Sequence, residues 1–133
     1  ALELGPAETG QGGVVRVAVY LRAERELLLA GLSFALGLEG EDRERLAVPL
    51  RFVAAEGRAP SLNDAELPGL LAVAWLDGVW VRAGEQALLG FGELEGPEAA
   101  EAVSRFRLFG AQANAAADGR PVPLSFRGSG ELR

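Results

Sequence analysis

The fold is decided by the stretch GLSFALGL, which occupies residues 31–38. Large apolar side chains at positions 32, 34, 36 and 38 alternate with glycine, serine or alanine at positions 31, 33, 35 and 37. A period of two is typical of a β-strand, because successive side chains of a strand point to opposite faces, whereas a helix would scatter them around its circumference. The stretch therefore predicts a strand with one apolar face toward a core and one face of small side chains.

Short apolar runs of the same kind recur along the chain. The run at 14–21 is rich in valine and places Val15, Val17, Val19 and Leu21 on one face. The 18 glycines and 7 prolines are spaced so that long helices have no room between them. Further strands are predicted at 46–53, 70–76, 87–94, 105–111, 122–126 and 130–133, with a possible first edge strand at 2–4.

Two segments contain good helix formers, and two dipeptides indicate turns. We expect at most a turn or two of helix at 24–30 and at 97–104, where Pro97 stands at a first helical position. Turns are predicted at 77–78 and 118–119, because both are Asp-Gly pairs, in which glycine tolerates positive φ and aspartate bonds the nearby backbone. The longest predicted loop covers residues 54–68.

About nine short strands separated by turn signals are typical of an antiparallel sandwich or barrel. With 49% apolar and 24% charged residues in 133, the chain can bury a core and lacks any apolar run long enough to span a bilayer. We therefore predict one all-β domain over residues 1–133.

Five residue types are absent: Cys, Met, His, Lys and Ile. Without His or Cys the chain has no thiol nucleophile, no imidazole base and none of the ligands that zinc or haem iron prefers, so most enzyme classes are disfavoured. We expect no enzyme activity, no cofactor and no metal site. The net charge of −6, with arginines scattered among glutamates, argues against nucleic-acid binding.

The start Ala1-Leu2-Glu3-Leu4 would suit a mature end left by a signal peptidase, which favours an exported protein. The exclusive use of arginine among basic residues indicates a GC-rich genome and is compatible with a thermophile.

The order of these runs resembles that of the cohesin domain, the jelly-roll module that receives dockerins. Its third strand is matched by 31–36 and its sixth by 70–77, and its C-terminal order of strand, Asp-Gly turn and glycine-rich strand is matched by 106–108, 118–122 and 128–132. Weaker matches are Gly12-Gly13 before the valine-rich strand, 45–48 and 86–94. The resemblance implies a jelly-roll β-sandwich in which the third, sixth and eighth strands share a sheet. Fibronectin-like and carbohydrate-binding sandwiches share much of the pattern.

If the predicted strands at 31–38, 70–76 and 105–111 share one sheet, their outward-facing residues form one surface, which is our candidate site. An antiparallel sheet open to water normally carries polar side chains on its solvent face, whereas here both faces are apolar, a pattern that marks partner surfaces. Covering of this face by residues 54–68 is the rival interpretation. The predicted interaction surface consists of Ser33, Ala35, Leu70, Ala72, Ala74, Leu76, Arg107 and Phe109.

A second candidate is Trp80, which follows the 77–78 turn and could stack on a sugar ring. A polysaccharide platform would need coplanar exposure of Trp80 with Tyr20, Trp75 and Phe109. The rival interpretation is a hydrophobic plug over the end of the sandwich.

Other polar groups give weaker signals. Two sets of carboxylates, Glu39, Glu41, Asp42 and Glu44, and Glu93, Glu95, Glu98 and Glu101, lack any feature that fixes a catalytic cleft between them. Asn63-Asp64, or Asn114 with Asp118, could offer oxygen ligands to calcium, although their spacing matches no defined loop. The sequence thus predicts a non-catalytic protein-interaction module of an exported or cell-envelope protein, with a dockerin-like partner or self-association. The alternative is a carbohydrate-binding module.

Overall fold

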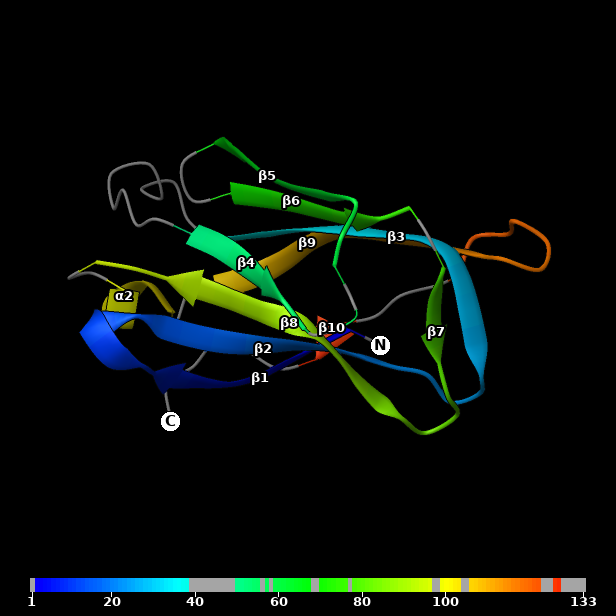
Figure 1. Cartoon of the computed structure of the whole chain (residues 1–133), viewed down its shortest axis with the longest axis horizontal. Helices are drawn as coiled ribbons and strands as arrows, with labels where there is room; N and C mark the ends of the chain where they lie inside the picture. The colour runs from blue at the N-terminus through cyan, green and yellow to red at the C-terminus, as the bar shows by residue number, and fades with distance from the viewer. Residues whose placement is uncertain are drawn as a thin grey trace.

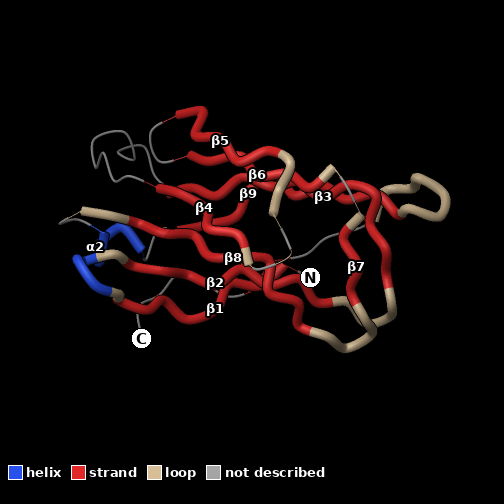
Figure 2. The backbone as a smooth tube through the Cα atoms, in the orientation of Figure 1, coloured by secondary structure: helices blue, strands red, loops and turns tan. Residues whose placement is uncertain are grey.

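The computed structural model describes residues 2–38, 50–55, 57, 59–67, 70–76, 78–96, 99–103, 106–122 and 126–127. Most of the described residues lie in β-strands, with short helical segments at one end (Figures 1 and 2). The elements are β1 (Leu2–Thr9), a 3₁₀ turn (Gln11–Gly13), β2 (Val15–Arg22), β3 (Leu27–Leu38), β4 (Leu50–Ala54), β5 (Leu62–Leu67), β6 (Leu70–Trp75), β7 (Val79–Val81), β8 (Gln86–Leu94), α2 (Ala99–Ala102), β9 (Phe106–Ala115) and β10 (Phe126–Arg127).

The strands form two sheets that pack face to face (Figure 1). The β2 sheet has the order β10-β1-β2-β8-β4, and the β3 sheet has β5, β6 and β3 in order, with β9 on the far side of β3. All pairs are antiparallel except β1 with β10. The sheets do not close into a barrel, so the predicted antiparallel β-sandwich is confirmed.

Alternation along the strands builds the core between the sheets. The large residues of the 31–38 stretch are all buried, as are the four inward positions predicted in β2. An aromatic cluster joins the sheets: the ring centroid of Trp75 lies 5.7 Å from those of Phe34 and Phe52. Phe106, on β9, is fully buried and packs directly on Gly92 of β8.

Several sequence predictions are wrong at the ends of strands. Residues 27–30 belong to β3 and not to a helix, because their side chains alternate in burial and pair with β7. The 54–68 segment contains β5, and β1 is an interior strand of eight residues, not a short edge strand. Near the strand predicted at 122–126, the described residues include a bridge at Pro121 and β10, and residues 123–125 lie outside the described part. β9 extends to Ala115.

The Asp-Gly pairs have different outcomes. At 118–119 the turn is confirmed, with Gly119 at φ +70° and the amide of Arg120 donating to Asp118 Oδ1 at 3.0 Å. At 77–78 the chain does not reverse, because β6 and β7 both run antiparallel along the same side of β3. Asp77 itself lies outside the described residues.

The helical turn predicted at 97–104 is present as α2, with Ala99 and Val103 buried. The predictions for 46–49 and 130–133 fall outside the described residues.

Candidate interaction surface

The outer face of the β3 sheet is set by the alternation in β3. Leu32, Phe34 and Leu36 are buried inward, and Ser33 and Ala35 are therefore on the outer side, where they are half-buried. In β6 the same alternation buries Leu71, Val73 and Trp75, while in β9 it buries Phe106 and Leu108.

Strand register brings the predicted surface residues together in rows across the sheet. One row contains Gln112, Ser33 and Ala74, and the next contains Phe109, Ala35 and Ala72. A third row contains Arg107, Gly37 and Leu70. The three strands implied by the resemblance thus share one sheet. Seven of the eight predicted residues, Leu70 by its backbone register alone, lie in these three adjacent rows.

Exposure differs among these residues. Ala72, Arg107 and Phe109 are half-buried and Ala74 is buried at 8% exposure. Leu76, the first residue after β6, lies outside the rows and is 73% exposed, with its amide donating to Ser61 Oγ at 3.1 Å. The guanidinium of Arg107 donates to the carbonyl of Phe106 at 2.8 Å. The centre of the surface therefore consists of small uncharged side chains. We call Ser33, Ala35 and Ala72 the small-residue floor.

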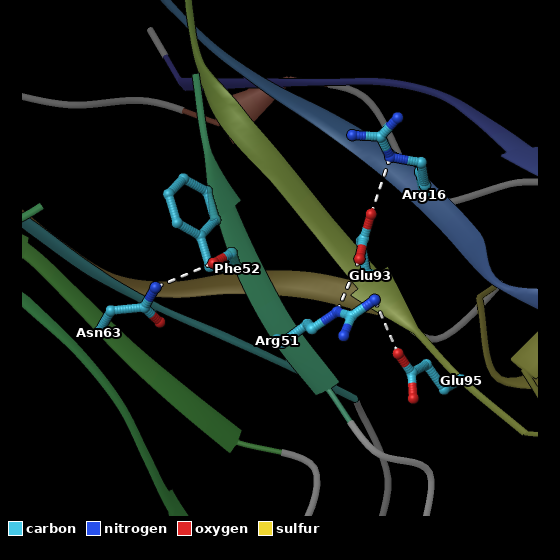
Figure 3. Close-up of polar contacts among 6 residues, drawn as sticks. All are labelled: Arg16, Arg51, Phe52, Asn63, Glu93 and Glu95. Carbon is cyan, nitrogen blue, oxygen red and sulfur yellow. Dashed lines mark hydrogen bonds and ion pairs between the residues drawn. The ribbon is translucent and has the colours of Figure 1, made fainter. Parts of the chain in front are cut away.

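The rival interpretation placed residues 54–68 over this face. Within the part that the structure describes, β5 continues the sheet as its edge strand beside β6, and so lies next to the face. Asn63 of β5 donates its side-chain amide to the carbonyl of Phe52 on β4 at 2.9 Å, which ties the edges of the two sheets together (Figure 3).

The outer face of the β2 sheet has a different character. Glu93 of β8, only 6% exposed, lies between two arginines of the neighbouring strands (Figure 3). Its Oε2 is 2.9 Å from Arg16 Nε, and its Oε1 accepts a hydrogen bond of 2.7 Å from Arg51 Nε. Arg51 also pairs with Glu95 at 2.8 Å, and Arg16 lies over the ring of Phe91 at 4.0 Å.

The hydrogen bond from Arg51 to Glu93 and the charge of that carboxylate raise the pKa of the Arg51 guanidinium, which stays cationic. The row of charges joins β2, β8 and β4 and gives this sheet a charged solvent face, whereas the centre of the β3 sheet carries the small side chains of Ser33, Ala35 and Ala72. Glu93 and Glu95 of the second carboxylate set are thus engaged in ion pairs. Glu101 is exposed, while Glu98 and the whole first set lie outside the described residues.

Trp80 is 46% exposed on β7 at the end of the β3 sheet. Its indole N–H donates to Glu26 Oε1 at 2.6 Å, and the guanidinium carbon of Arg82 lies 4.8 Å from its ring centroid. Sequence reasoning missed Glu26 and Arg82, because it treated 24–30 as helical and so hid the pairing of β3 with β7.

The four aromatic residues considered for a glycan platform are separated. Trp75 is buried in the core, and Phe109 is on the outer face of the β3 sheet. Tyr20 is on the outer face of the β2 sheet, close to Gly5. They therefore do not form one platform with Trp80.

The described residues hold no group of three or more potential metal-ligating side chains, and no helix among them is long and apolar enough to cross a membrane. Asn63 and Asp118, considered for calcium, use their side chains for the hydrogen bonds given above. Comparison of the chain with protein-family models, curated proteins and solved structures finds no match.

Proposed function

We propose that the chain is a non-catalytic interaction module whose protein partner docks on the outer face of the β3 sheet. The observation that carries the proposal is the difference between the two outer faces. The β2 sheet faces outward with the paired charges of Arg16, Glu93 and Arg51, whereas the centre of the β3 sheet presents Ser33, Ala35 and Ala72 without charge. A sheet face with small side chains at its centre and an aromatic residue and an arginine, Phe109 and Arg107, on the neighbouring strand has the composition expected of a partner surface.

We further propose that the module is cohesin-like and belongs to an exported or envelope protein. The sharing of one sheet by β3, β6 and β9, which the sequence resemblance implied, supports the first part. The separation of the aromatic residues onto different faces disfavours the alternative of a polysaccharide platform.

The proposal requires that the face be open, which one substitution tests. Ala72→Glu places a charge in the middle of the small-residue floor, and Val53→Glu is its control, because Val53 is 38% exposed on the edge strand of the other sheet. On an open face, both variants should unfold in urea within about 0.5 kcal/mol of the wild type, as exposed substitutions usually do.

A covered face gives a different result. If other parts of the chain bury Ala72, its replacement by glutamate buries a charge without a partner and lowers the free energy of unfolding by more than about 2 kcal/mol. That result for Ala72→Glu, with Val53→Glu unchanged, would overturn the proposal.

A further inference from the structure

The exposed large apolar side chains of this protein are unevenly distributed. Four such residues are found in the described part of the chain, and three of them belong to the β3 sheet or directly follow one of its strands. These three are Leu28 on β3, Leu76 after β6 and Trp80 on β7, with exposed fractions of 50%, 73% and 46%. The fourth is Val53, on β4 of the other sheet. Figure 1 shows that β7 and the first part of β3 bend away from β6 at one end of the sandwich.

Leu28 and Trp80 form one surface. They are register partners in the β3–β7 pair, and both point outward because their neighbours Leu29, Val79 and Val81 are buried. The same register, continued by one residue, puts Glu26 opposite Arg82, which agrees with the contacts that both make to the indole. We call Glu26, Leu28, Trp80 and Arg82 the Trp80 patch.

The indole ring is held in place before any partner arrives. Its N–H is fixed by the carboxylate of Glu26, and the guanidinium of Arg82 lies over the ring. A tryptophan that is already ordered loses little side-chain entropy on binding, and tryptophan and arginine are the residues most often found in energetic hot spots of interfaces.

Charge identifies the partner. The chain has a net charge of −6, so contact between two copies is opposed by repulsion over most of the surface. The Trp80 patch, in contrast, contains one acidic and one basic residue, both exposed, around an apolar centre. A two-fold axis through such a patch lets the acid of each copy face the base of the other, which is the self-complementarity that symmetric dimers require.

We infer that the Trp80 patch binds a second copy of this chain in a two-fold dimer, with Glu26 of each copy facing Arg82 of the other. The inference rests on the proposed function, because it names the partner of one end of the same open sheet. The apolar centre consists of two side chains, Leu28 and Trp80, so the interface falls at the small end of known interfaces, below about 1,200 Å² in total, and the dimer is weak and reversible.

Charge reversal tests this arrangement. Glu26→Arg makes the patch doubly positive and Arg82→Glu makes it doubly negative, so each variant alone should dimerise at least about tenfold more weakly than wild type in sedimentation equilibrium. Mixed in equal amounts, the two variants should recover dimerisation as heterodimers, because opposite patches then meet. Val53→Glu, on the exposed side of the edge strand of the other sheet, is the matched control and should dimerise like wild type.

Tryptophan fluorescence supplies a second readout. Trp75 is buried in the core, so a concentration-dependent loss of acrylamide quenching in the wild type reports burial of Trp80. Urea unfolding of each variant checks that the monomer is intact.

Any of three results would overturn the inference. The wild type could remain monomeric, the single variants could dimerise as wild type does, or the mixture of Glu26→Arg with Arg82→Glu could stay monomeric. These results are separate from the fate of the proposed function, which depends on the stability of Ala72→Glu. Loss of dimer in Ala72→Glu alone would place the copies on the small-residue floor, overturning the inference and leaving the proposed function standing.

Discussion

Replacement of Gly92 by alanine tests how closely the two sheets approach. A Cβ at this position would lie 2.5 Å from Cζ and 3.0 Å from Cε2 of Phe106. Ordinary carbon contacts begin near 3.5 Å, so the ring would have to move by roughly 1 Å. Phe106 is fully buried among other core residues and has no open space to enter.

The expected cost follows from these contacts. Overpacking of a core costs about 1–3 kcal/mol, and the lower chain entropy of alanine offsets about 0.4–1 kcal/mol of it. We therefore expect Gly92→Ala to lose about 1–2 kcal/mol, or about 4–8 °C in Tm for a domain of this size.

Urea unfolding and calorimetry measure the effect, with Gly10→Ala as the control. Gly10 is exposed at φ −96°, and the nearest atom to its Cβ would be the Val14 carbonyl oxygen at an ordinary 3.6 Å. The control should stay within about 0.5 kcal/mol of wild type. Adding Phe106→Leu should relieve the strain of Gly92→Ala, with a coupling of at least about 0.5 kcal/mol. Equal stability of Gly92→Ala and Gly10→Ala would refute the described packing.

Three further predictions concern side chains outside this contact. Glu93→Gln should lower the urea midpoint more than Glu95→Gln does, because Glu93 is buried between two arginines whereas Glu95 is more exposed; equal midpoints would contradict the network. Asp118→Ala should cost about 1 kcal/mol or less through loss of the hydrogen bond to the Arg120 amide, and a loss above about 2 kcal/mol would show that Asp118 has another role. In Trp80→Phe the remaining tryptophan fluorescence comes from Trp75, and acrylamide should barely quench it because Trp75 is buried; strong quenching would contradict the burial of Trp75.

The core strands could be predicted because their side chains carry the pattern themselves. In the 31–38 stretch and in β2, every second residue is a large apolar one, and a strand is the structure that buries all of them together. The sites of the Asp-Gly pairs show the limit of such reasoning. The pair at 118–119 makes its own turn through a local hydrogen bond, whereas the strands before and after 77–78, β6 and β7, pair in succession with the same strand, β3.

The candidate surface could be predicted only in part, for a similar reason. Alternation indicates which side of a strand faces outward, but the rows that join Ser33 to Ala74 and Ala35 to Phe109 depend on pairing between distant strands. Residues 24–30 contain good helix formers, and only the pairing of β3 with β7 turns 27–30 into a strand. The contact of Glu26 with Trp80 follows from that pairing, so local sequence could not reveal it.

Sedimentation velocity of the wild-type chain over a wide concentration range tests the central claim most directly, because it needs no knowledge of a ligand. The exposed Trp80 patch, at the end of the β3 sheet, predicts a reversible shift toward dimer as concentration rises. A sedimentation coefficient that stays at the monomer value at every concentration would contradict the claim that this patch binds a second copy of the chain.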